Sequence, residues 1–171
     1  MKGKYQTYIQ LLEVILNNAK NLKLAGKELL KISLKYKEVR PFAQFMFYTC
    51  LEECGKFLLI KDRYPKSINN QILNKVGFYN HNKKIERLVT NLEREHGTLN
   101  PNKIRKKREV TRIIRENLRE GSLYVDDKNG RIIRPTFTKS SKVLNNMVNA
   151  VKSSIELCEF RLQEFRDKYN E

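Results

Sequence analysis

The sequence contains little glycine and proline, with seven and four of 171 residues, and it contains no tryptophan. Few tight turns are therefore available, and long helices are expected. No run of about 18 apolar residues occurs, so no membrane-spanning helix is predicted. The first residues, MKGKYQTYIQ, lack the apolar stretch of an export signal. These absences predict a single soluble domain over residues 1–171, located in the cytoplasm and not bound to a membrane.

Cysteine is also scarce, with three residues: Cys50, Cys54 and Cys158. Their spacing does not match a metal-ligand pattern, and an odd number suits a reducing compartment. Cys50 and Cys54 lie one helical turn apart, where they can share a buried face as small apolar residues. The sequence thus predicts no metal site and no cofactor.

Acidic residues are few compared with basic ones. Lysine and arginine total 35 against 19 acids, which gives a formal net charge of +16. Such an excess favours encounter with polyanions, so RNA, DNA, ribosomes and anionic membrane surfaces are candidate partners. The excess is also typical of a protein from a lysine-rich proteome, because charge alone is an unspecific guide to partners.

Apolar residues recur every three or four positions over most of the chain, which is typical of amphipathic helices. We expect helices over 4–37, 41–62, 67–75, 80–95, 103–119 and from about 140 to 169. The first half of the second helix, PFAQFMFYTCL, is apolar around nearly its whole circumference. Such a helix belongs in the middle of a bundle. The sequence therefore predicts an all-α fold, an antiparallel bundle of about five helices.

One segment, near 122–135, does not follow the helical pattern. Two β-prone triplets, Leu123–Val125 and Arg131–Ile133, flank the sequence Asp127-Lys128-Asn129-Gly130. Asn-Gly between such runs is a hairpin turn signal. A short β-hairpin-like insertion is therefore predicted here.

Three charges interrupt the apolar second helix: Glu52, Glu53 and Lys56. Lys56 follows the two glutamates at positions i+4 and i+3, so one helical turn can neutralise it. A buried ion is costly unless it is paired and hydrogen-bonded. Gly55 within this turn lowers helix propensity by about 1 kcal/mol relative to alanine, which calls for a reason such as close helix contact. The alternative is an ordinary exposed salt bridge.

A second polar group lies at His81 and Lys84, three positions apart near the start of a predicted helix. Histidine is suited to proton transfer near neutral pH. His81 is alternatively a helix cap or a surface residue. The other histidine, His96, precedes Gly97 and is expected beside a helix end.

The segment 103–119 contains eight basic residues and two acids. It is expected to form a surface helix whose outer face binds nucleic acid through phosphate contacts. The residues predicted to do so are Lys103, Arg105, Lys106, Lys107, Arg108, Arg112 and Arg115. No aromatic stacking partners are evident within this helix, so sequence-specific reading of single-stranded RNA is not indicated.

Taken together, these motifs resemble the AbiV-type abortive-infection family of the HEPN-like helical bundles. The resemblance covers nearly the whole chain and rests on four motifs in order: Asn18-Ala19; Glu52, Glu53, Gly55 and Lys56; His81 and Lys84; and Leu123–Asp126 followed by Pro135. It implies a single HEPN-like domain that stops phage multiplication, and a homodimer as the common assembly.

The resemblance also implies a possible metal-independent endoribonuclease, since many HEPN-like proteins use an Arg-x(4–6)-His motif. In that motif the histidine helps the ribose 2′-OH to attack and the arginine stabilises the developing charge. This sequence has no arginine at that spacing before either histidine. Lys75, with five residues between it and His81, is the nearest substitute, although lysine lacks the guanidinium fork.

The first functional hypothesis is a phage-defence effector that suppresses gene expression or translation in the infected cell by acting on RNA or a ribosome-associated target. Its site would combine Glu53, Lys56, His81 and Lys84. Glu53 would orient Lys56 or His81, His81 would transfer a proton, and the two lysines would neutralise a phosphate.

The second hypothesis is a non-enzymatic interaction protein that binds a phage or host protein, with the same residues holding the bundle together. A third, a DNA-binding regulator, has less support because no helix-turn-helix pair is evident. Cleavage of RNA by the purified protein in EDTA discriminates the first from the second.

Overall fold

The computed structural model describes residues 2–64, 70–94, 126–128, 131–133 and 141–169. The described elements are α1 (Lys2–Ile32), a 3₁₀ turn η1 (Lys37–Val39), α2 (Arg40–Lys61), α3 (Asn70–Val76), α4 (His81–Arg94), β1 (Asp126–Lys128), β2 (Arg131–Ile133) and α6 (Ser141–Tyr169). The all-α bundle predicted from the sequence is confirmed. The predicted helix over 103–119 lies outside the described residues.

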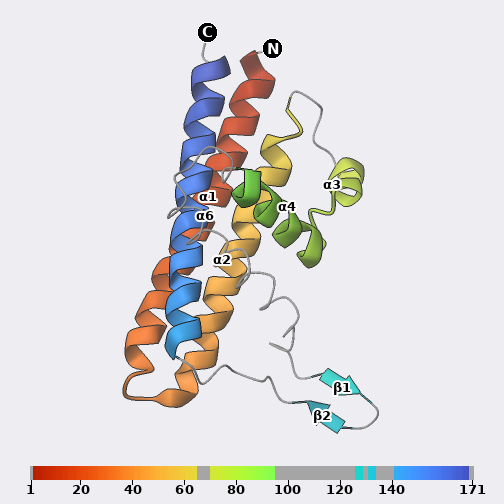
Figure 1. Ribbon diagram of the computed structural model, residues 1–171. Helices are drawn as coiled ribbons and strands as arrows, with labels where there is room; N and C mark the ends of the chain where they lie inside the picture. Colours follow the sequence, from red (N-terminus) through yellow and green to blue (C-terminus); the bar gives the residue numbers. More distant parts are fainter. Residues whose placement is uncertain (1, 65–69, 95–125, 129–130, 134–140, 170–171) are drawn as a thin grey trace.

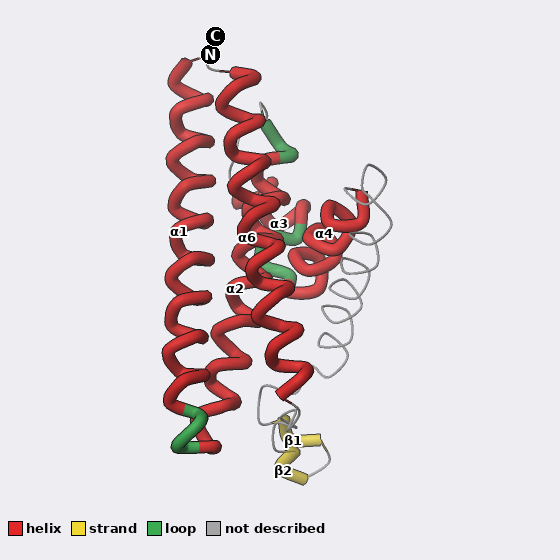
Figure 2. Tube along the Cα trace, turned by 60° about the vertical axis from the view of Figure 1, so that its left-hand side comes forward, coloured by secondary structure: helices red, strands yellow, loops and turns green. Residues whose placement is uncertain are grey.

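The three long helices α1, α2 and α6 lie side by side and form the body of the molecule (Figure 1). α1 runs from the end that holds both chain termini to the opposite end, and α2 and α6 both run back toward the termini. The shorter α4 lies obliquely across α2, with α3 beside it (Figures 1 and 2). α2 packs against α1, α4 and α6, so it is the central helix.

The composition of α2 explains its central position. Pro41 lies in the first turn of the helix, where its fixed φ is favourable and its missing N–H is not needed. Twelve residues of α2 are buried, including Phe47 and Phe57 at 0 % exposure. The core is completed by apolar stripes of the neighbouring helices, such as the fully buried Leu12 of α1 and Leu88 of α4. The prediction of a helix contacted from several sides is confirmed.

The end of α1 differs from its prediction. The helix ends at Ile32, not at residue 37, and Leu34, which lies within the predicted helix, is 80 % exposed. The chain tightens after Ile32 into i→i+3 bonds, with the Leu34 amide donating to the Lys31 carbonyl at 3.1 Å. The chain must reverse its direction before Pro41. It therefore leaves the helix several residues before the apolar pattern ends.

The two strands form an antiparallel pair, with Asp126 opposite Ile133 and Lys128 opposite Arg131. This register is the one expected of strands separated by two residues, here Asn129 and Gly130. The first strand begins at Asp126, three residues later than the predicted triplet at 123–125. The remainder of the segment 122–135 lies outside the described residues.

Candidate functional site

The charged turn of α2 is buried. The exposed fractions of Glu52 and Glu53 are 6 % and 8 %, whereas Lys56 is partly exposed. The alternative of an ordinary surface salt bridge is therefore wrong. Because a buried carboxylate is costly without partners, the contacts of these two glutamates decide what the turn does.

The segment between α3 and α4 has a defined backbone. Gly77 follows α3 in the left-handed region, at φ 79°, which glycine adopts without strain. The Phe78 amide donates to the Leu73 carbonyl at 3.0 Å and the Gly77 amide to the Asn74 carbonyl at 3.1 Å. These are the two hydrogen bonds of a Schellman motif, which ends α3 and redirects the chain toward α4.

Asn80 then begins α4 as its N-cap. Its side-chain Oδ1 accepts a hydrogen bond from the Lys83 amide at 3.0 Å, satisfying one of the free amides of the first turn. His81 is consequently the first residue of the helix, and Lys84 lies three positions later on the same side. The alternative that His81 itself caps the helix is wrong, because Asn80 does so.

Gly55 brings this first turn of α4 against α2. A Cβ atom at position 55 would collide with the backbone carbonyl of Lys84, which cannot move independently of its helix. The absence of a side chain therefore permits the close approach of the two helices. The close contact anticipated from the propensity cost of Gly55 is confirmed.

Glu52 binds both polar residues of α4. Its Oε1 lies 2.5 Å from Nδ1 of His81, and its Oε2 lies 3.3 Å from Nζ of Lys84. The carboxylate and the ammonium are both buried, at 8 % and 5 % side-chain exposure, whereas the imidazole is 62 % exposed. One buried carboxylate thus joins a buried cation to a histidine that reaches the surface.

Glu53 has a different partner. It forms an ion pair with Lys56 within the same turn, and the Lys56 ammonium lies 5.6 Å from the centre of the Phe78 ring. The carboxylate that contacts His81 is therefore Glu52, a residue that was not included in the predicted site. The four predicted residues occur in two neighbouring pairs, His81 with Lys84 through Glu52, and Glu53 with Lys56.

The Glu52–His81 contact has a chemical consequence. An ionised carboxylate only accepts hydrogen bonds, so Nδ1 of His81 carries the hydrogen and donates it to Glu52. The second ring nitrogen, Nε2, is then the nitrogen available to accept a proton on the exposed part of the ring. A carboxylate that orients an imidazole in this way is the arrangement of a general base.

The other predicted residues are not all placed. Lys75 lies exposed on α3. His96 and the seven basic residues predicted to bind nucleic acid, from Lys103 to Arg115, lie outside the described residues. In the described part of the chain, no His, Cys, Asp or Glu side chains form a group of three suited to a metal ion. None of the described helices combines the length and apolarity needed to cross a membrane.

The three cysteines are buried and carry free thiols. Cys50 donates to the Ala19 carbonyl at 3.1 Å, which ties α2 to α1 at the Asn18-Ala19 pair of the first helix. A hydrogen bond with Cys54 and burial raise the pKa of the Cys50 thiol well above its usual range. A hydrogen bond with Cys158 is the main reason that the pKa of Cys54 is also raised. These thiols act as packing groups, as the sequence predicted.

A separate pocket lies between the end of α2 and the end of α6, and its lining contains none of the predicted site residues. Tyr64 and Tyr169 form part of its wall, with ring centres 4.6 Å apart. The acidic side chains at its rim include Asp62, which is paired with Arg87 of α4. The pocket thus belongs to the packing of the bundle end, not to the Glu52–His81 site.

Comparison with known families shows to which family the chain belongs. The sequence model of the AbiV family, a HEPN-type family, matches residues 7–156, which include every described residue of the Glu52–His81 site. No curated protein and no solved structure matches the chain. The match extends over far more than half of the sequence and agrees with the all-α bundle, so the chain belongs to the AbiV family of HEPN-type proteins.

Proposed function

We propose that this protein is an abortive-infection effector that suppresses gene expression in a phage-infected cell by acting on RNA at the Glu52–His81 pair. Membership of the AbiV family supports a role in phage defence. The observation that carries the RNA part of the proposal is the 2.5 Å contact between a buried carboxylate and an exposed imidazole. The imidazole is 62 % exposed, so a substrate can reach it.

The proposed reaction is transesterification of RNA. Nε2 of His81 accepts the proton of a ribose 2′-OH, and the 2′-oxygen forms a bond to the adjacent phosphorus. The bond from phosphorus to the 5′-oxygen then breaks, and the leaving oxygen takes a proton from solvent. The products are a 2′,3′-cyclic phosphate and a 5′-hydroxyl. Glu52 stabilises the imidazolium that forms after the proton transfer.

The lysines have unequal parts in this proposal. Lys84 is buried and paired with Glu52, so it balances the carboxylate and does not reach a phosphate. Lys56 is 24 % exposed and can neutralise charge on a bound phosphate, although it is also paired with Glu53. This assignment changes the expected role of Lys84 from phosphate ligand to positioning residue. The basic segment 103–119 is proposed to guide the RNA, and a homodimer is the proposed assembly.

The decisive experiment measures RNA cleavage by the purified full-length chain in EDTA, with products analysed for 2′,3′-cyclic phosphate. We expect His81→Ala to abolish cleavage and Glu52→Gln to reduce it by about 100-fold, within the usual contribution of acid–base groups. His96→Ala is the matched control and is expected to retain activity. Intact RNA with the parent protein, or cleavage that survives His81→Ala, would contradict the proposal.

A non-enzymatic binding function is the second candidate, and one observation favours it. The Glu52–Lys84 pair is buried on both sides and joins α2 to α4 whether or not a substrate is present. In that case the cluster stabilises a surface that binds a phage or host protein. Phage protection that persists in His81→Ala, together with intact RNA, would support this second function.

A further inference from the structure

We infer that Tyr79 is a stacking platform for an unpaired base of the RNA that His81 acts on, so that the substrate is single-stranded RNA. The inference rests on the proposed function, because it names the substrate class of the same site. Tyr79 is 58 % exposed and is separated from His81 by one residue. Two residues span at most about 7 Å of backbone, so the Cα atoms of Tyr79 and His81 are no farther apart than that.

The ring of Tyr79 packs against the ring of Phe78. Its centre lies 5.2 Å from that of Phe78, with the two planes at 85°. Phe78 is itself half-buried against the core and has the Lys56 ammonium 5.6 Å from its ring centre. Tyr79 therefore rests on an anchored residue, which lowers the conformational entropy lost when a ligand stacks on it.

The backbone around Tyr79 is equally fixed. The Schellman motif at Gly77 precedes it and the Asn80 cap follows it, and the Asn80 amide donates to the Gly77 carbonyl at 2.9 Å. Tyr79 is thus an exposed aromatic residue held between two hydrogen-bonded turns, so its ring is presented to solvent from a defined position.

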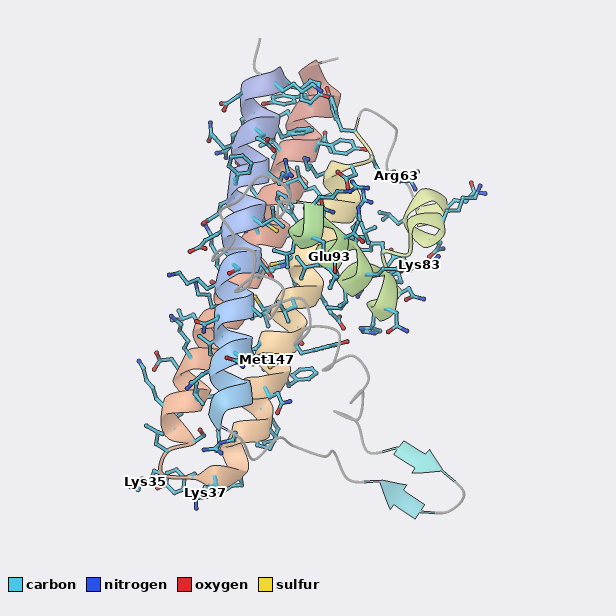
Figure 3. All side chains as sticks on the ribbon, in the orientation of Figure 1. Lys35, Lys37, Arg63, Lys83, Glu93 and Met147 are labelled. Atoms are coloured by element: carbon cyan, nitrogen blue, oxygen red, sulfur yellow. The ribbon has the colours of Figure 1, made fainter. Side chains whose placement is uncertain are left out.

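The charge beside Tyr79 favours a nucleic acid over an apolar peptide. The aliphatic part of Lys83 packs closely against Gly77, which holds this exposed lysine next to the turn that carries Tyr79. Figure 3 shows Lys83 beside α3 and α4. An aromatic face combined with nearby cations is the arrangement that binds single-stranded nucleic acid, because a base stacks while its phosphate is neutralised.

The same geometry selects against duplexes. In a double helix the base faces are already stacked on their neighbours and cannot reach a ring on the protein surface. A single strand offers an unstacked base at low cost. Tyr79 thus distinguishes strandedness and is not expected to read a particular sequence, since every base has a π-face.

The test measures binding in the full-length His81→Ala protein, so that cleavage does not intervene. Fluorescence anisotropy compares a short labelled single-stranded RNA with the same sequence in a duplex, at one fixed salt concentration. We expect Tyr79→Ala to weaken single-strand binding by about 10-fold and to leave duplex binding unchanged. Tyr79→Phe keeps the ring and should stay within about twofold, whereas Tyr79→Leu keeps apolar bulk without the π-face and should behave like alanine.

Tyr36→Ala is the matched control, because Tyr36 is a similarly exposed tyrosine at 47 %. It lies at the turn between α1 and α2, where Figure 3 labels its neighbours Lys35 and Lys37. Unchanged single-strand affinity in Tyr79→Ala, equal losses for both RNA forms, or an equal loss in Tyr36→Ala would overturn the inference. Failure of the parent protein to cleave RNA would instead contradict the proposed function, and the binding comparison would still decide the role of Tyr79.

Discussion

Lys84 illustrates how a single residue can hold two helices and a candidate site together. Its ammonium is buried with one carboxylate oxygen of Glu52, while the other oxygen holds the imidazole of His81. A buried pair of this kind contributes little net stability compared with apolar residues of the same size. Removing one partner alone is costly, because it leaves the other charge without compensation.

We therefore predict that Lys84→Met lowers the free energy of unfolding by about 3 kcal/mol. The double variant Glu52→Leu with Lys84→Met should recover much of that loss, since neither charge remains buried. Lys20→Met is the matched control, because Lys20 pairs with Glu159 at 2.7 Å on the surface, with both side chains 45 % exposed. It should cost less than about 1 kcal/mol. Denaturant unfolding measures the stability of all three variants. A loss of stability in Lys84→Met no larger than that in Lys20→Met would contradict the importance given to the buried pair.

Cys50 carries a prediction for alkaline pH. Its folded-state pKa is raised by the hydrogen bond with Cys54 and by burial, from an ordinary value of 9.0. Above pH 9 the unfolded chain loses this proton while the folded chain keeps it, so the free energy of unfolding must fall as pH rises. The full contribution of the thiol is present below that pH. We expect a slope of about 1 kcal/mol per pH unit between pH 9 and 10 from this residue.

Denaturant unfolding at several pH values, with Cys50→Ala for comparison, isolates this slope. The variant should lose less stability per pH unit than the parent, although its stability at neutral pH is lower because a buried side chain has been shortened. Tyr8, whose pKa is also raised, contributes in the same direction in both proteins, whereas Cys54 loses its hydrogen bond with Cys50 in the variant. Parallel slopes in the two proteins would show that the Cys50 proton is not linked to folding.

At the scale of the elements, the contact between α2 and α4 depends on Gly55. An added Cβ meets the Lys84 carbonyl, so α4 has to move away from α2 as a unit. We predict that Gly55→Ala lowers the free energy of unfolding by about 2 kcal/mol, despite the higher helix propensity of alanine. The same change should abolish the proposed RNA cleavage, because Glu52 no longer reaches α4.

Gly26→Ala is the comparison for this prediction. A Cβ at Gly26 meets the ring of Phe47, a side chain, and not the backbone of another helix. It should destabilise the bundle while leaving the Glu52–His81 contact and its activity intact. Denaturant unfolding and the cleavage assay, measured on both variants, separate a local effect on α4 from a general loss of stability. Equal effects of the two changes on activity would contradict the role given to Gly55.

The elements also show what the sequence could and could not predict. The 3.6-residue period placed the long helices, and the apolar circumference of α2 predicted its central position. The end of α1 was missed because the apolar pattern continues to Leu34 after the helix has ended. Periodicity reports which residues suit a helix, whereas the point of chain reversal depends on the position of the next helix.

The candidate site was predicted only in part, for a related reason. The pattern identified the charged turn of α2 and the His81 turn, and the structure brings them together. It could not choose between Glu52 and Glu53, because adjacent helical residues point about 100° apart and either could have faced α4. That choice depends on the rotation of α2 within the bundle, which long-range packing determines.

At the scale of the whole molecule, the net charge of +16 predicts that the proposed RNA binding is sensitive to salt. The logarithm of the affinity should fall linearly with the logarithm of the salt concentration. We predict that replacing Arg105, Lys106 and Lys107 with glutamine reduces the steepness of that line by about 2, since each phosphate contact on a single strand contributes about 0.7.

The matched control replaces Lys31, in the last turn of α1, and Lys35 and Lys37, between α1 and α2, with glutamine. All three lysines are exposed. This control removes the same charge from a different part of the sequence, so its effect on the slope should be small. Anisotropy titrations at several salt concentrations provide both slopes. Equal changes in the two triple variants would mean that total charge, and not the segment 103–119, determines RNA binding.

The separation of Glu52 and His81 along the chain has a consequence during synthesis. They are 29 residues apart, and α4 must leave the ribosome before its first turn can dock on α2. A nascent chain that ends before Lys84 has emerged carries the α2 carboxylate without either of its partners. The Glu52–His81 pair therefore cannot assemble until more than half of the protein has been made.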